Sequence, residues 1–413
     1  KKGLMYIFYS CLYKILLELA SVYYVFPKFI YTGFDLDITL SKLIISWITY
    51  FGLLIIYPNK LRKPSDFLMT FKLFIILTPI LSYYALSNSN TYHLFTILFG
   101  SIITLYSRHL ASLRIPLLKK SKPLAVYISV TMVFLITAWL IYVRGFSGLD
   151  FNIFTIYDRR EDISQSVNIG IFSYGITWLT KVIGPFLITF ALWKKKRYYI
   201  FPIIILSVLW FGFTAHKSVL FNPFLVLLVY FWLKKSQWFY TIPLTFSFFI
   251  TIGFFLYNLT SFGLILSYLI RRSLMVPALL TFKYYEFFSE NPYVFWSNSF
   301  TSGFINYPYN LSPPELISNY LGAVGHANNS YLSTGYMHAG IIGVVLYGAI
   351  VGMLFSYIDK LIKYDIPSWV IICSLIVPVK IIITSVDLTT GLLTHGLFLS
   401  IILVTLLRSR RFT

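Results

Sequence analysis

The segment Gly325–Gly343, GHANNSYLSTGYMHAGIIG, gathers several side chains that can do chemistry. His326 is followed by Asn328 and Asn329, and Tyr336 comes shortly before the sequence turns apolar. An imidazole can take a proton from a hydroxyl group at neutral pH, and an asparagine amide can orient a sugar hydroxyl or cap the following helix. We therefore predict that His326 is a catalytic base and that Asn328, Asn329 and Tyr336 bind the hydroxyl-bearing acceptor.

Two pairs of adjacent arginines, Arg159-Arg160 and Arg271-Arg272, are candidates for binding phosphate groups. A guanidinium binds phosphate oxygens in a bidentate manner and keeps its charge. Lys217, within FGFTAHKSVLF, could supply a further charge to an anionic head group, because ionisable residues among apolar neighbours are often functional. Purely structural interpretations stay open: acids flank Arg159-Arg160, and a basic side chain at a helix end can extend to lipid phosphates.

His338 lies about three helical turns after His326 and is a second candidate for the same role. His93, His109 and His395 lack a polar cluster like the one around His326, so we interpret them as structural. The sequence contains no HExxH, CxxC or phosphate-binding glycine loop, and we therefore predict neither a metal nor a nucleotide cofactor.

The elements that must position these residues are predicted to be membrane helices. Hydrophobic residues make up 58% of the chain, and apolar runs near the length needed to cross a bilayer, roughly 20 residues, recur throughout. Lipid allows only helices or closed barrels, and the runs are too long for strands. We predict an all-α protein with one integral domain, 1–413. About twelve spans are expected at 5–24, 38–57, 67–87, 93–107, 124–143, 169–193, 200–214, 217–233, 239–258, 338–357, 367–385 and 392–407.

Three local features refine this topology. The spans 200–214 and 217–233 are short, so we expect a hairpin that does not fully cross, with its tip at Thr214–Lys217. Lys14 and Glu18 are one helical turn apart and can form an ion pair. Cys11 and Cys373 both fall in predicted spans, which argues against a disulfide framework.

The charge distribution orients the chain. With both termini in the cytoplasm, most of the 34 basic residues fall in short cytoplasmic loops, as the positive-inside bias requires. The net charge of +20 is thus mainly a topology signal, and its scatter over separate loops argues against nucleic-acid binding.

Two outer loops are longer than the rest, at approximately 144–168 and 260–337. Loops longer than about 15 residues are usually functional or disordered. The second loop is rich in tyrosine, phenylalanine and tryptophan, so we expect it to fold onto the membrane surface. Residues 264–288 are predicted to form one amphipathic helix near the interface.

The chain resembles the Wzy-type polymerases of O-antigen and capsule repeat units, within the O-antigen polymerase and ligase superfamily. The resemblance covers the whole length: about twelve spans, and a long outer loop before the last three. Locally it rests on HANNSYLSTGYMHAGIIG with its G-x-x-G at Gly340 and Gly343, on FTAHKSVL, and on Arg159 with Gly170 as an Arg-x10-Gly pattern. The second outer loop lacks that last pattern, because neither arginine of the second pair has a glycine at that distance.

The resemblance implies a GT-C-like helical fold in the bacterial cytoplasmic membrane, with the active site on the outer face. It also implies an undecaprenyl-pyrophosphate-linked oligosaccharide as donor and the terminal sugar of another lipid-linked repeat as acceptor. A chain-length regulator and a flippase are the implied protein partners. No metal or nucleotide is required, because a polyprenyl pyrophosphate is already an activated leaving group whose developing charge basic residues can neutralise.

Two other functions remain open. An O-antigen ligase would use the same donor and pass the glycan to lipid A core. A flippase for lipid-linked oligosaccharides would be a transporter, a class in which two halves of similar topology are typical. The single dominant outer loop near the C-terminal third favours an enzyme.

Overall fold

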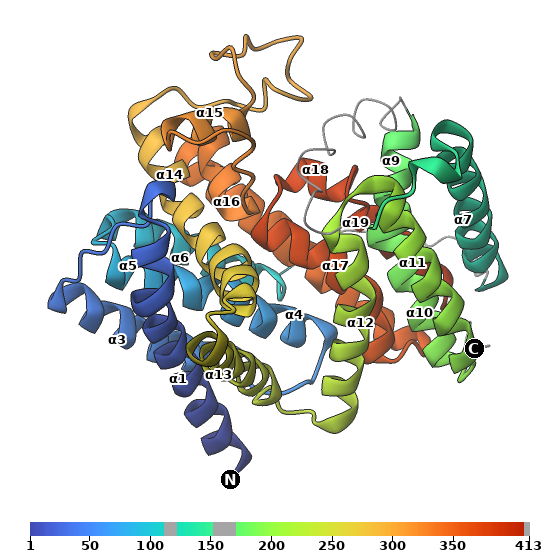
Figure 1. Ribbon diagram of the computed structural model, residues 1–413, viewed down its shortest axis with the longest axis horizontal. Helices are drawn as coiled ribbons and strands as arrows, with labels where there is room; N and C mark the ends of the chain where they lie inside the picture. Colours follow the sequence, from blue (N-terminus) through green and yellow to red (C-terminus); the bar gives the residue numbers. More distant parts are fainter. Residues whose placement is uncertain (111–121, 152–170, 409–413) are drawn as a thin grey trace. The chain divides into compact units, whose positions relative to one another are not determined.

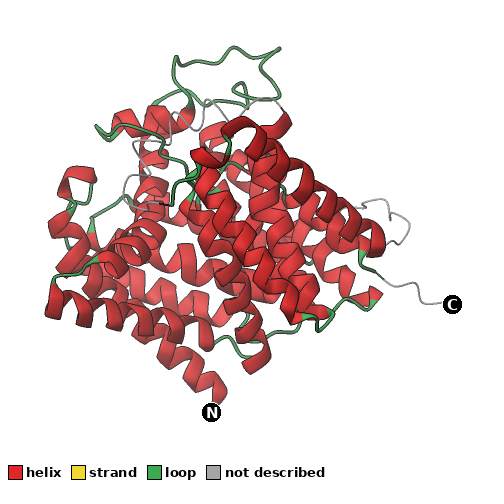
Figure 2. Ribbon diagram, turned by 45° about the vertical axis from the view of Figure 1, so that its right-hand side comes forward, coloured by secondary structure: helices red, strands yellow, loops and turns green. Residues whose placement is uncertain are grey.

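The structure, a computed structural model, describes residues 1–110, 122–151 and 171–408 (Figure 1). The elements in these ranges are helices, and Figure 2 shows loops as the only other component. The chain forms two compact units. Unit 1 consists of Lys1–Leu113, Ser236–Ser356 and Ile382–Leu388, and unit 2 of Arg114–Lys235, Tyr357–Ile381 and Thr389–Thr413. That the two units together make up one integral membrane domain stays a prediction.

The prediction of an all-α, membrane-embedded protein is confirmed. In the part of the chain that the structure describes, nine helices are long and apolar enough to span a bilayer. They are Lys2–Lys28, Pro64–Leu86, Lys122–Arg144, Phe172–Trp193, Arg197–Thr214, Lys217–Lys235, Thr241–Thr260, Tyr331–Tyr364 and Leu388–Leu406. Three shorter apolar helices, Leu40–Ile56, Thr91–Ser107 and Ser368–Thr384, coincide with the remaining predicted spans. That these three also cross the membrane stays a prediction.

Unit 1 is built around helices from both ends of the sequence. Helix α1 packs along α13, and α3 packs against α5. Its helices are α1 (Lys2–Ala20), α2 (Phe26–Lys28), α3 (Leu40–Ile56), α4 (Pro64–Lys72), α5 (Thr78–Leu86), α6 (Thr91–Ser107), α13 (Thr241–Thr260), α14 (Val276–Glu290), α15 (Pro313–Tyr320) and most of α16 (Tyr331–Lys360).

Two buried basic side chains of unit 1 are paired with acids. The predicted ion pair between Lys14 and Glu18 is confirmed, and the Lys14 ammonium also donates to Ser46 Oγ at 3.0 Å. Arg108 Nη1 lies 2.8 Å from Asp66 Oδ1, with both side chains almost fully buried. These pairs follow from the high cost of leaving a single charge inside an apolar core.

The predicted amphipathic helix at 264–288 is helical but is not a surface helix throughout. A π-helical segment, Leu266–Met275, runs directly into α14. Most of α14 is buried, including Phe282, Tyr284 and Tyr285, and it contacts α5, α6 and α15. The sequence misleads here because the aromatic residues that suggest an interface instead fill the interior of unit 1.

Helix α16 contains a sharp break. Ala339 and Gly340 have non-helical backbone angles, and Gly340 has φ +57°. After the break the chain turns back, so that a Cβ placed on Gly343 would overlap the carbonyl oxygen of Gly335. The G-x-x-G of Gly340 and Gly343 therefore has a physical basis: one glycine supplies the left-handed turn and the other the close helix contact.

Unit 2 contains the second set of apolar helices. They are α7 (Lys122–Arg144), α9 (Ile171–Trp178), α10 (Gly184–Trp193), α11 (Ile200–Thr214), α12 (Lys217–Lys235), most of α17 (Ser368–Thr384), most of α18 (Leu388–Leu392) and α19 (Leu397–Leu406). The predicted hairpin tip is confirmed, because α11 ends at Thr214, Ala215 has φ +53°, and α12 begins at Lys217. Each arm is long and apolar enough to cross the membrane. That the hairpin crosses only in part stays a prediction.

The interpretation of His395 as a residue without polar neighbours is wrong. Its Nδ1 atom lies 2.7 Å from Lys181 Nζ within unit 2. The two residues are separated by 214 positions in the sequence, so local composition gave no sign of the contact.

Candidate functional site

His326 lies in the connection between α15 and α16, and its side chain is 60% exposed. Its Nδ1 atom is 4.0 Å from Oε1 of Glu315, an acid in the first turn of α15. The other carboxylate oxygen of Glu315 accepts hydrogen bonds from Ser312 N at 3.0 Å and Ser312 Oγ at 2.6 Å. This capping box fixes the carboxylate, so the imidazole faces an acid of defined position.

The electrostatics of this pair suit proton transfer. The two hydrogen bonds from Ser312 lower the pKa of Glu315 below its ordinary value, and His326 lowers it further. Glu315 is therefore charged at neutral pH and can stabilise a protonated imidazole. Within the described ranges, His326 makes no hydrogen bond through its other ring nitrogen, Nε2, which is the atom open to a substrate.

The loop that carries His326 is attached to the buried part of unit 1. Ala327 N donates to Pro314 O at 2.9 Å, and Tyr284 Oη donates to Ala327 O at 3.0 Å. Asn329 Nδ2 donates to Thr281 Oγ1 at 3.1 Å, while its Oδ1 accepts from the backbone at the start of α16. These contacts hold the backbone on the C-terminal side of His326 without covering its ring.

The residues predicted to bind the acceptor do not share one environment. Asn328 is exposed beside His326. Asn329 is 1% exposed, and Tyr336 is buried with its ring stacked on Tyr285 at 4.1 Å between ring centres. Asn329 and Tyr336 thus pack within unit 1 and offer little surface, and their contact with an acceptor stays a prediction.

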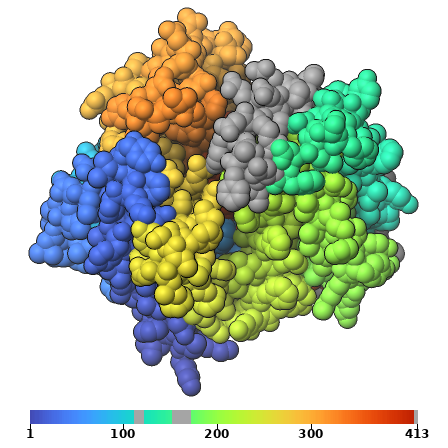
Figure 3. Space-filling view, viewed as in Figure 1, coloured from blue at the N-terminus to red at the C-terminus, as the bar shows by residue number. Residues whose placement is uncertain are grey.

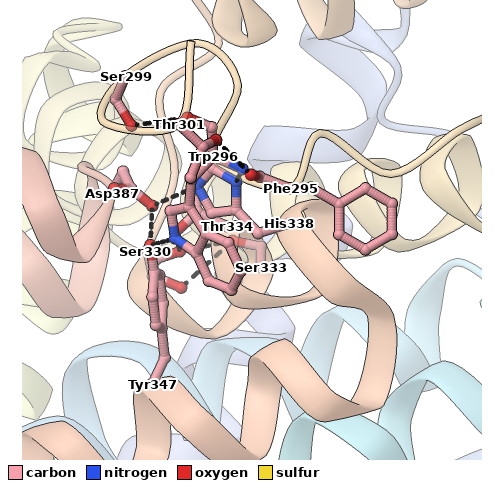
Figure 4. A network of polar contacts seen from close by, with 10 residues as sticks. All are labelled: Phe295, Trp296, Ser299, Thr301, Ser330, Ser333, Thr334, His338, Tyr347 and Asp387. Atoms are coloured by element: carbon pink, nitrogen blue, oxygen red, sulfur yellow. Dashed lines mark hydrogen bonds and ion pairs between the residues drawn. The ribbon is translucent and has the colours of Figure 1, made fainter. Parts of the chain in front are cut away.

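His338 belongs to a buried polar network that Figure 4 shows from close by. Its Nδ1 atom accepts a hydrogen bond from Trp296 N at 3.1 Å, and its Nε2 atom lies 3.2 Å from Asp387 Oδ1. Tyr347 Oη donates to the same oxygen of Asp387 at 3.0 Å, and Trp296 Nε1 donates to Tyr347 Oη at 2.7 Å. The indole of Trp296 is stacked on the imidazole, with 4.8 Å between ring centres.

These contacts define the tautomer of His338. A backbone N–H can only donate, so Nδ1 carries no proton and Nε2–H donates to Asp387. Both ring nitrogens are therefore used, and the residue is 1% exposed. His338 has no nitrogen left for a substrate and acts as a connection between Trp296 and Asp387.

The same network attaches the segment after α14 to the break in α16. Val294 N and Phe295 N donate to the carbonyl oxygens of Met337 and His338, both at 3.0 Å, which would otherwise lack partners at the helix end. Phe295 and Trp296 have φ +47° and +59°, an unfavourable conformation for such residues. The backbone and side-chain contacts together stabilise this conformation.

Sequence reasoning missed Asp387, Tyr347 and Trp296. Asp387 is separated from His338 by 49 positions, and no spacing motif connects them. One available signal was the presence of an acidic residue, within TSVDLTT, at the predicted outer end of a span. Such residues are rare near membrane segments and are often functional or paired.

The predicted phosphate-binding residues are distributed over both units. Arg271 is half-buried in unit 1, with its guanidinium carbon 3.9 Å from the centre of the Phe29 ring, and Arg272 is exposed. Lys217 is the first residue of α12 in unit 2. Arg159 and Arg160 lie outside the described residues.

In the ranges that the structure describes, no three His, Cys, Asp or Glu side chains are grouped as ligands for a metal ion. Comparison of the chain with family models, with curated proteins and with solved structures finds no match.

Proposed function

We propose that the chain is a membrane glycosyltransferase that polymerises lipid-linked oligosaccharide repeat units. The observation that supports this best is the His326–Glu315 pair, an accessible base beside a fixed acid in a chain otherwise made of apolar helices. A proton acceptor of this kind suits the activation of a sugar hydroxyl at the surface of a membrane. The enzyme would act at the outer face of the bacterial cytoplasmic membrane, with a GT-C-like fold and both termini in the cytoplasm.

In the proposed reaction, Nε2 of His326 takes the proton from a hydroxyl group on the terminal sugar of the acceptor repeat. The acceptor oxygen forms a bond to the anomeric carbon of the growing glycan, and the bond from that carbon to the donor pyrophosphate breaks. The electron pair leaves with undecaprenyl pyrophosphate. Glu315 stabilises the imidazolium that forms, and we assign the orientation of the acceptor to Asn328, which is exposed near His326.

The charge that develops on the leaving pyrophosphate needs fixed positive groups. We propose Arg271 for this role, supported by its fixed position on Phe29. Arg272, Lys217, Arg159 and Arg160 are the further donor-binding candidates. A flippase that delivers the repeat units and a chain-length regulator are the proposed partners.

An O-antigen ligase is the second candidate, because the same base and donor would serve transfer of the glycan to lipid A core. A flippase has less support, because transport does not require a base in contact with an acid. Cells that lack the protein distinguish the three functions. Single-repeat glycan indicates a polymerase, long glycan retained on the carrier a ligase, and unflipped repeats on the cytoplasmic side a flippase.

The residue-level experiment replaces His326 in cells that assemble the glycan. His326→Gln keeps a hydrogen-bonding side chain but cannot accept the proton, so we expect single repeats to accumulate on the lipid carrier. His109→Gln is the matched control. His109 is also exposed, but it follows the C-terminal end of α6, on the side of the membrane that we predict to be cytoplasmic. Glycan of ordinary length with His326→Gln, at equal protein level, would exclude His326 as the base.

A further inference from the structure

One edge of unit 1 combines positive charges with aromatic rings. It is formed by the π-helical segment Ser21–Val25 with the adjoining α2, the C-terminal end of α13 and the π-helical segment Leu266–Met275. In Figure 3 the yellow segment containing α13 and the approach to α14 lies at the surface beside the blue N-terminal residues. The two π-helical segments, Ser21–Val25 and Leu266–Met275, contact each other directly.

Lys28 occupies this edge with an unusual set of contacts. Its Nζ atom lies 5.1 Å from the ring centre of Tyr24 and 4.5 Å from that of Tyr257. The side chain is exposed, and these rings are its contacts within the described ranges. A cation–π contact holds an ammonium group in place without using its N–H donors.

Arg271 is held at the same edge in a similar way. Its guanidinium lies over the ring of Phe29, the residue directly after Lys28. Stacking over an aromatic ring fixes the plane and position of a guanidinium. Tyr24 connects the two cations: its hydroxyl donates to Gly263 O at 3.0 Å and lies within electrostatic reach of both charges.

Lys42 shows what a structural lysine looks like in the same unit. It also lies over a tyrosine ring, 5.5 Å from the centre of Tyr84. Its ammonium, however, donates to the carbonyl oxygens of Asn88 at 2.7 Å and Ser89 at 2.6 Å. The Lys42 ammonium therefore connects α3 to the turn after α5 by hydrogen bonds, whereas the Lys28 ammonium contacts only aromatic rings within the described ranges.

We propose that Lys28 and Arg271 form a binding site for a phosphate group carried by a membrane lipid. Two cations held by aromatic rings at the same edge match the negative charge of a phosphate or pyrophosphate, and the exposed ammonium of Lys28 can donate to its oxygens. Tyr24, Tyr257 and Phe29 supply the aromatic surroundings typical of the membrane–water interface, where such a head group lies. The assignment of this phosphate to the polyprenyl-pyrophosphate donor rests on the proposed function. An anionic phospholipid offers the same chemistry.

The site can be tested by binding alone, without turnover. The full-length protein in detergent is titrated by native mass spectrometry with farnesyl pyrophosphate, with phosphatidylglycerol and with phosphatidylcholine as a zwitterionic control. We expect the two anionic probes to bind better than the control. Lys28→Ala and Arg271→Ala should each weaken anionic binding by about tenfold, the effect of losing a charged hydrogen-bond donor. Lys28→Arg should preserve it.

Lys42→Ala is the matched control and should bind like the unaltered protein. If Arg271→Ala fails to fold, Lys28→Glu tests the site from an exposed position. A preference for farnesyl pyrophosphate assigns the site to the glycan donor, and a preference for phosphatidylglycerol assigns it to a phospholipid; either result supports the phosphate site. Unchanged anionic binding in Lys28→Ala and Lys28→Glu would overturn it. Because no glycan is formed, this outcome is independent of the result for His326.

Discussion

His326, in the connection before α16, and His338, within α16 just before its break, each lie beside a carboxylate. They differ in that the first side chain is exposed and the second is buried. His326 is 60% exposed and lies 4.0 Å from Glu315, which is 40% exposed. His338 is 1% exposed and lies 3.2 Å from Asp387, which is 18% exposed. The buried pair has the shorter contact, but only the exposed pair can meet a substrate. Proximity to an acid is therefore a poor guide to which histidine does chemistry.

The deciding difference is the use of the two ring nitrogens. In His338 both nitrogens are bonded within the protein, to Trp296 and Asp387. In His326 one nitrogen faces Glu315, and the other makes no hydrogen bond within the described residues. We therefore expect replacement of His326 to reduce activity without affecting the fold, and replacement of His338 to do the reverse.

The largest expected effect is on the rate with His326→Ala. Loss of a general base typically lowers a rate by about 10²–10⁴-fold. The melting temperature should stay close to that of the unaltered protein, because the side chain is mostly exposed. Chain extension on a purified lipid-linked repeat unit and thermal unfolding in detergent measure the two quantities. A variant with a lowered melting temperature and substantial remaining activity would make His326 a structural residue like His338.

His338→Ala tests the other side of the comparison. The Trp296 backbone N–H and the Asp387 carboxylate each lose a partner, and a buried polar group left unsatisfied costs about 1–3 kcal/mol of stability. The segment 297–312 should become more sensitive to protease, because its attachment to the break in α16 is weakened. Limited proteolysis with thermal unfolding measures this change.

Tyr347→Phe is the graded control for that experiment. It removes one hydrogen bond to Asp387 and the acceptor for Trp296 Nε1 while keeping the ring, so it should have a smaller effect in the same direction. Ordinary stability of His338→Ala combined with loss of chain extension would reverse the two roles.

The sequence was a good guide wherever a local pattern determines the structure. Apolar runs located the membrane helices, and the spacing of one helical turn located the ion pair of Lys14 with Glu18. The exposed connection carrying His326 was likewise recognisable from its polar residues. Each of these features depends on residues close together in the chain.

Features that depend on distant residues could not be predicted. Asp387 meets His338 only because the break at Gly340 turns the chain back and a later segment packs beside it. Asn329 and Tyr336 have polar groups that suit a binding site, but α14 covers both of them. Composition shows what a side chain can do, whereas burial decides whether it meets a ligand.

Glu315→Gln removes the negative charge that faces His326 while keeping a side chain of similar size in the same position. Glutamine at this helical position still serves the capping box with Ser312, so α15 should keep its start. Only the negative charge facing His326 is lost. Because exposed ion pairs are weak, we expect chain extension to slow by about two- to fivefold. A loss as large as that of His326→Ala would make Glu315 a direct participant in proton transfer.

The smallest effect concerns the pH dependence of the α15 cap. Hydrogen bonds from Ser312 lower the pKa of Glu315 below its ordinary value of 4.5. A lowered pKa in the folded state means that the cap is fully stabilising above pH 4.5 and is lost as the pH falls through the lower folded value. Hydrogen exchange across Pro313–Tyr320 should therefore accelerate only under more acidic conditions than pH 4.5, after correction for the intrinsic exchange rate.

Ser312→Ala provides the matched test, because it removes the side-chain donor and keeps the backbone one. The onset of fraying should then move upward toward pH 4.5, while the exchange of the buried segment around His338 keeps the profile of the unaltered protein. An unchanged onset in Ser312→Ala would mean that the serine hydroxyl does not fix the Glu315 carboxylate. The acid facing His326 would then be mobile, and the exposed pair would lose the defined geometry that distinguishes it from an ordinary surface contact.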